Sequence, residues 1–163
     1  MKTTQKNISA ILTLLVIVFG GWFVLNSQNV LDWWKLRSYV PSEQIANLSN
    51  DASFSDIGRR LFYVHDPALL PKADFKGKCT VGEETIVLGC YLSHEKIYVF
   101  DVDDVRLEGV EQVTAAHEML HAVYDRLSTD EKRDLDSKLV AFYESLKDPR
   151  LTKTVENYRS RDP

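Results

Sequence analysis

The sequence lacks a basic surface patch. Lysine and arginine number 20 against 24 aspartate and glutamate residues, and the net charge is −4, with acids and bases interspersed. A protein whose main partner is nucleic acid needs clustered basic side chains that contact phosphates. The composition therefore excludes nucleic acid as the main partner.

Cysteine is scarce, and only Cys79 and Cys90 are present. The segment between them predicts two short strands about a turn at residues 82–85, which brings the two cysteines opposite each other. A cross-strand disulfide is then geometrically feasible, and an even pair in an exported domain favours it. Two buried free thiols are the alternative.

Charge is absent from residues 8–25, a run of 18 residues just long enough to cross hydrocarbon as a helix. Lys2 and Lys6 precede this run, and no good cleavage site follows it closely, so we predict an uncleaved signal anchor. Cleavage after Ser27 is the alternative. Because the tail ahead of the run is short, we expect a single-pass membrane protein whose C-terminal part is extracytoplasmic.

The apolar run sets the expected domain organisation. We expect an N-terminal tail at residues 1–7, the anchor at 8–25, a juxtamembrane connector at 26–50, a folded domain at 51–148 and a C-terminal tail at 149–163. Trp33 and Trp34 in the connector fit either an aromatic belt at the membrane interface or the beginning of the folded core.

The folded domain is expected to be α+β. A helix ends near Tyr63, short strands follow up to Phe100 in an antiparallel or mixed sheet, and two helices occupy about 110–127 and 129–147. We expect a turn at 47–51 and a polar loop at 72–78. The apolar side chains of the last two helices are predicted to face the core: Val113, Ala116, Leu120, Val123, Tyr124 and Leu127 in one, and Leu135, Leu139, Phe142 and Leu146 in the other.

The most informative pattern is His117-Glu118-Met119-Leu120-His121, inside the first of these two helices. Histidines four residues apart stand on one face of an α-helix, about 6 Å apart along its axis, so both reach one metal ion. Imidazole is a preferred ligand of Zn²⁺, and a carboxylate beside the pair is placed to act as general base. We therefore predict that His117 and His121 bind zinc and that Glu118 is catalytic. A helix with two surface histidines is the alternative.

This motif, on a helix that follows a strand, resembles the zincin metallopeptidases, and most closely their Glu-type subclass. The resemblance covers residues 53–146, and its specific part is the five-residue motif. It implies a zincin-like domain that hydrolyses peptide bonds of a protein or peptide substrate. It also implies that the strand Ile97-Tyr98-Val99-Phe100 is an edge strand, to which the extended substrate adds.

The third metal ligand is not fixed by the sequence. Metzincins carry a glycine and a third histidine where this chain has Tyr124 and Leu127, which excludes that subclass. Glu131 is predicted to belong to a capping box. The ligand stays open between Glu144, which is expected to point to water, Glu156 and a residue outside this chain.

Asp125 continues the face of His121, about 12 Å along the helix axis from His117. We expect it to orient His121 and not to bind the metal. His65 and His94 are isolated and have no partner at ligand spacing.

Two other functions stay open. Gly89-Cys90-Tyr91-Leu92-Ser93 followed by the histidine motif faintly resembles peptide deformylase, in which a cysteine supplies the third ligand, although the glycine-rich N-terminal motif of that family is missing. The other alternative is a membrane-tethered, non-catalytic protein that binds a metal or another protein. The unassigned third ligand supports it.

Overall fold

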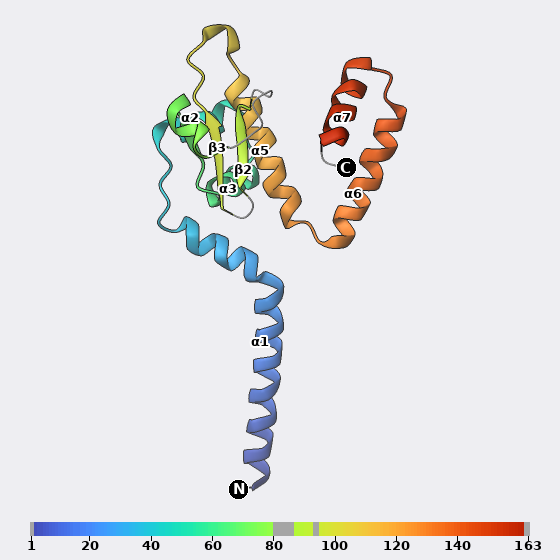
Figure 1. Ribbon diagram of the computed structural model, residues 1–163. Coiled ribbons are helices and arrows are strands. Elements are labelled where there is room, and N and C mark those ends of the chain that lie inside the picture. Colours follow the sequence, from blue (N-terminus) through green and yellow to red (C-terminus); the bar gives the residue numbers. More distant parts are fainter. Residues whose placement is uncertain (1, 80–86, 93–94, 162–163) are drawn as a thin grey trace.

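The computed structural model describes residues 2–79, 87–92 and 95–161 (Figure 1). These residues are mostly helical and include a small mixed sheet, as the α+β prediction requires. In chain order the elements are α1 (Lys2–Leu36), α2 (Glu43–Asp51), α3 (Asp56–Val64), β1 (Ala68–Leu70), α4 (Lys72–Lys76), β2 (Gly89–Leu92), β3 (Lys96–Phe100), a 3-10 turn (Val105–Leu107), α5 (Val110–Arg126), α6 (Thr129–Ser145) and α7 (Pro149–Arg161).

The N-terminal helix α1 extends away from the folded domain (Figure 1). Its residues 11–36 are long and apolar enough to cross a membrane, and the side chains of residues 11–25 are exposed. The helix continues through the first part of the predicted connector, up to Leu36. Trp33 and Trp34 are 60% and 66% exposed, so they do not begin the core.

The sheet has the order β1-β3-β2 among the described residues. β1 runs parallel to β3, with Ala68 opposite Tyr98, and β2 runs antiparallel to β3, with Cys90 opposite Tyr98. The predicted edge strand, residues 97–100, is therefore the central strand, and this prediction was wrong. The three residues of β1 are too few to show a strand periodicity in the sequence, so the second partner of β3 was missed.

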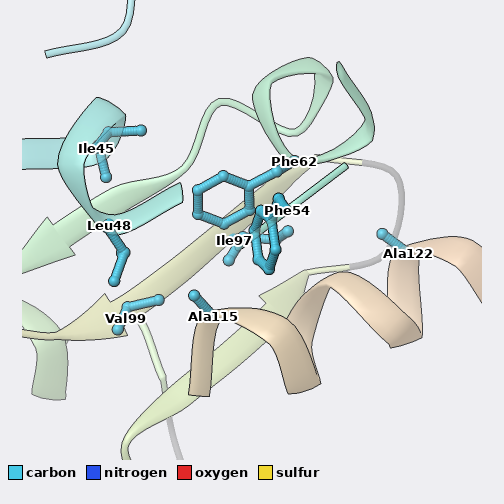
Figure 2. Packing of buried hydrophobic residues seen from close by; sticks show 8 residues of the cluster. All are labelled: Ile45, Leu48, Phe54, Phe62, Ile97, Val99, Ala115 and Ala122. Atoms are coloured by element: carbon cyan, nitrogen blue, oxygen red, sulfur yellow. The ribbon is translucent and has the colours of Figure 1, made fainter. Parts of the chain in front are cut away.

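The two faces of β3 pack against different helices, because successive side chains of a strand point to opposite faces. Ile97 and Val99 are fully buried in the main core, which Figure 2 shows. The other buried members of this core come from α2, from the end of the loop before α3, from α3 and from α5: Ile45, Leu48, Phe54, Phe62, Ala115 and Ala122. On the other face, Tyr98 packs in a smaller cluster with Phe75 of α4 and Cys79. The sheet is therefore covered on both faces.

Local capping explains two of the helices. Ser42 accepts a hydrogen bond from the Ile45 amide at the start of α2, and Ser55 accepts one from the Gly58 amide at the start of α3. The predicted turn at 47–51 is the end of α2, which buries Ile45 and Leu48. The packed core thus begins before residue 51, inside the predicted connector.

The predicted polar loop at 72–78 contains the short helix α4. Its Phe75 is buried, and the ring lies 5.6 Å from the ring of Phe100 between centroids. This contact with the sheet orders a segment whose lysine-rich sequence gives no apolar periodicity.

The buried face of α5 differs from the predicted one. Ala115, Glu118 and Ala122 are buried, whereas Val113 and Leu120 are 72% and 61% exposed. The helix packs closely on β2 and β3, and small side chains permit that approach. The prediction was wrong for the large residues Val113 and Leu120, whereas Ala116 of the predicted arc does pack against the main core.

The C-terminal helices α6 and α7 lie beside the domain (Figure 1). Ser128 and Glu131 form the predicted capping box at the start of α6. No residue of α6 is buried, and Leu139 and Phe142 of the predicted core-facing stripe are exposed. The apolar stripe of α6 therefore does not contribute to the core.

Candidate active site

The predicted histidine motif lies across the boundary between the core and the solvent. Glu118 is only 7% exposed and faces the sheet, whereas His117 and His121 are exposed. The two imidazole rings are nearly perpendicular, and their Nε2 atoms are 3.2 Å apart. Two imidazole nitrogens thus lie in contact at the surface of α5, on the helix that also carries the buried carboxylate of Glu118.

The separation of the two nitrogens fits a zinc ion. Two nitrogens at about 2.05 Å from a tetrahedral zinc ion are about 3.3 Å apart. The observed distance between His117 Nε2 and His121 Nε2 is 3.2 Å. The distance is compatible with a shared zinc ion, and it equally fits a hydrogen bond between the two imidazole rings.

Burial and one backbone contact define the state of Glu118. Burial raises the pKa of the Glu118 carboxyl, while the positive form of His117 and a backbone hydrogen bond from Tyr91 lower it. Tyr91 belongs to β2, so the outer strand of the sheet holds the carboxylate that α5 supplies. A buried carboxyl with a raised pKa beside two histidines is the usual setting of a general base.

Gly89 permits this approach of β2 to α5. A Cβ atom at position 89 would lie 2.5 Å from Thr114 Cγ2 and 2.8 Å from Glu118 Cγ and Oε1. Any side chain there would displace the carboxylate or the strand. No motif in the sequence indicates the roles of Gly89 and Tyr91 beside Glu118. A glycine inside a predicted strand, which often marks a close backbone approach, was the available signal.

Asp125 lies near His121, as expected from its spacing, but no hydrogen bond joins the two side chains among the described residues. Partial burial and the positive form of His117 lower the pKa of His121, and the charge of Asp125 raises it. The Oδ2 atom of Asp125 is buried and has no hydrogen-bond partner in the described part of the chain. The influence of Asp125 on His121 in this structure is therefore electrostatic.

The third ligand is not in place. Glu131 accepts hydrogen bonds from the Ser128 amide and hydroxyl at 2.8 and 2.7 Å, and Glu144 and Glu156 are exposed on α6 and α7. Within residues 2–79, 87–92 and 95–161, no group of three or more His, Cys, Asp and Glu side chains could hold a metal ion. The structure thus brings together two histidine nitrogens and a buried carboxylate.

A disulfide joins Cys79 to Cys90, with the two Cα atoms 5.9 Å apart. Cys90 lies in β2, but Cys79 follows α4 and belongs to no strand, and the predicted turn at 82–85 lies outside the described residues. The bridge occupies the Cys90 sulfur, so this sulfur is not available as the metal ligand that the deformylase resemblance requires. The bond also ties the start of β2 to the segment after α4.

His65 contacts Tyr91, the residue whose backbone donates to Glu118. His65 is 4% exposed, and its ring packs edge-on against the ring of Tyr91 at 5.3 Å between centroids. His94 lies outside the described residues.

Comparisons of this chain with protein-family models, with curated proteins and with solved structures gave no match. The interpretation of the site consequently depends on its own geometry.

Proposed function

We propose that the protein is a membrane-anchored zinc metallopeptidase. The observation that carries this proposal is the 3.2 Å separation of His117 Nε2 and His121 Nε2 beside the buried carboxylate of Glu118. His117 and His121 would hold the zinc ion, which supplies Lewis-acid chemistry and lowers the pKa of water when it is bound.

Glu118 would perform the proton transfers. Its carboxylate accepts a proton from the attacking water and donates it to the leaving amine of the cleaved peptide bond. The raised pKa of Glu118 supports this role, because a general base works best when its pKa is near the working pH. The backbone hydrogen bond from Tyr91 fixes the orientation of the carboxylate.

The proposed substrate is a protein or peptide in extended conformation, added to an outer strand of the sheet that the described residues form. Since β3 is central, this role passes from residues 97–100 to β2, the strand next to Glu118. The Tyr91 amide donates to Glu118 and is not available to a substrate, so the peptide would pair with the other outward-facing backbone groups of β2, next to the carboxylate.

An extracytoplasmic location of the domain is part of the proposal. The disulfide between Cys79 and Cys90 supports it, because disulfides persist in oxidising compartments. The anchor would be α1, of which residues 11–36 meet the length and hydropathy of a membrane span.

A non-catalytic, membrane-tethered metal- or protein-binding domain is the second candidate. It is favoured by the incomplete ligand set, since catalytic zinc sites normally have three protein ligands and the described residues bring together two.

Cleavage of an unfolded protein distinguishes the two candidates. The full chain in detergent is loaded with zinc and incubated with a reduced, unfolded protein, and the products are sequenced. A peptidase gives new amino termini, loses activity with a chelator and recovers it with zinc. Zinc binding at about one ion per chain without new termini would support the binding domain.

A further inference from the structure

The end of α1 is packed against the folded domain. The carboxylate of Asp32 receives two hydrogen bonds from Arg126, the last residue of α5, with N···O distances of 2.6 and 3.0 Å. The side chains of Arg126 and Asp32 are only 17% and 6% exposed. An ion pair with this geometry and burial links the anchor helix directly to the helix that carries the histidines.

A second contact follows where the chain leaves α1. The rings of Tyr39 and Tyr63 are 5.6 Å apart between centroids, and burial together with the charge of Asp66 raises the pKa of Tyr39 to about 12. Tyr63 belongs to α3. The anchor and the domain are therefore joined through a packed contact, in contrast to a flexible tether.

Figure 1 shows that α1 bends. Its first part, in dark blue, runs straight, and its last part, in lighter blue, turns across that direction underneath the domain. If the first part crosses a bilayer, the last part runs along the membrane surface. The domain then lies on the side of this segment that is turned away from the membrane.

The exposed side chains of this last part match a lipid interface. Trp34 lies at the rim of the contact between α1 and the domain, where it lines a pocket with His65 and Arg126. Trp33, one residue after Asp32, lies about 100° around the helix from the ion pair. Trp33 and Trp34 are both largely exposed, and the guanidinium of Arg37 lies 5.7 Å from the centroid of the Trp33 ring. Tryptophan and basic residues are enriched at the boundary between hydrocarbon and water.

The exposed charge on the last part of α1 also matches a lipid surface. Between residues 26 and 42 the basic residues are Lys35 and Arg37, both exposed, and the acidic residue is Asp32, which Arg126 neutralises. The exposed charge is thus entirely positive, which favours contact with anionic headgroups.

We propose that the last part of α1 lies in the interfacial layer of the bilayer through Trp33 and Trp34, and that the Asp32–Arg126 pair fixes the domain at that height. The partner of this surface is the lipid bilayer itself. The placement of this segment rests on the membrane anchoring in the proposed function, and its test requires neither zinc nor catalysis, whereas the substrate class that follows from it rests on the proposed peptidase activity as well.

The proposal defines where a substrate would be cleaved. Arg126 follows His121 by five residues and His117 by nine, so both histidines lie within roughly 15 Å of it along α5. The site is then held close to the membrane surface. Suitable substrates are extended segments of other membrane proteins immediately outside their spans.

Tryptophan quenching in vesicles tests the placement. The full chain is reconstituted in vesicles of phosphatidylcholine and phosphatidylglycerol. The Trp22→Phe variant keeps Trp33 and Trp34 as the fluorescent residues. The double variant Trp33→Phe with Trp34→Phe keeps Trp22, which serves as the control inside the bilayer. Lipids brominated near the headgroup end of the acyl chain should quench Trp33 and Trp34 about twofold, and more strongly than aqueous iodide does. Stronger quenching by iodide than by these lipids would overturn the proposal.

A distance measurement tests the role of the ion pair. A donor dye on Val113→Cys, an exposed position on α5, is paired with acceptors at the vesicle surface under non-reducing conditions. Asp32→Asn combined with Arg126→Gln removes both charges without leaving either one buried, and circular dichroism checks that the chain is folded. The distribution of donor distances should be narrow in the parent chain and broad in the double variant. Equal distributions would show that the pair does not hold the domain.

Discussion

Two regions of the molecule differ in whether their apolar residues are covered. One is the sheet together with α5, and the other is the pair of C-terminal helices α6 and α7. In α5, the small residues Ala115 and Ala122 are fully buried against the strands. In α6, which is equally long and better capped, no side chain is buried and Phe142 is 62% exposed. An apolar stripe thus predicts a helix, but burial of the stripe depends on a partner surface. The residues of the candidate site, His117, Glu118 and His121, all belong to the region formed by the sheet and α5.

The largest difference between the two regions should appear in stability. Phe62→Ala removes a fully buried ring from the main core and should lower the free energy of unfolding by about 3–5 kcal/mol. Phe142→Ala, the same change on α6, should alter it by at most about 0.5 kcal/mol. Urea unfolding of the full chain in detergent, followed by circular dichroism, measures both. A comparable loss in the two variants would show that α6 is packed.

A smaller effect should come from the contact between β2 and α5. Gly89→Ala places a Cβ 2.5 Å from Thr114 Cγ2, and such overpacking costs about 1–3 kcal/mol. It should also reduce cleavage, because the same Cβ lies 2.8 Å from Glu118 Oε1.

Gly77→Ala is the matched control for this glycine. The nearest atom to a Cβ at that position is Asp74 O at 3.6 Å, an ordinary contact, and the residue has a helical φ of −80°. Stability and cleavage should stay close to those of the parent chain. Equal losses in the two variants would contradict the role given to Gly89.

The smallest of the expected effects is a gain in stability on replacement of Glu118 by glutamine. Burial raises the pKa of Glu118 in the folded state above its ordinary value of 4.5, so ionised Glu118 opposes folding. In the presence of a chelator, Glu118→Gln should be more stable than the parent chain at neutral pH.

The pH dependence of this gain gives its control. Below pH 4.5 the carboxyl is protonated in the folded and unfolded states, and the variant should have no advantage. As the pH rises from 4.5 through the raised pKa of the folded state, the parent chain loses stability relative to the variant. Unfolding curves at several pH values measure this difference, and a gain that is constant with pH would have another cause.

The sequence predicted those features that depend on local spacing. The helix of the motif, the capping box of Ser128 and Glu131 and the shared helix face of His117 and His121 require only neighbours along the chain, and the structure contains all of them. The proximity of the two imidazoles follows from helix geometry alone.

The missed features depend on contacts between distant segments. The central position of β3 requires β1, and the burial of Glu118 requires the approach of Gly89 and Tyr91 from β2. The packing of Asp32 on Arg126 joins residues 94 positions apart, which no periodicity can indicate. The sequence therefore predicted the helix that carries the two histidines and Glu118, but not the strand that packs against Glu118.

The most direct test of the zinc peptidase is cleavage by Glu118→Gln at equal zinc content. The variant keeps both histidines, so it should bind zinc as the parent chain does and lose about 10²–10⁴-fold in the rate of cleavage of an unfolded protein. Glu108→Gln, which changes an exposed acid just before α5, is the control and should cleave at the parental rate. Equal rates for Glu118→Gln and the parent chain would contradict the account.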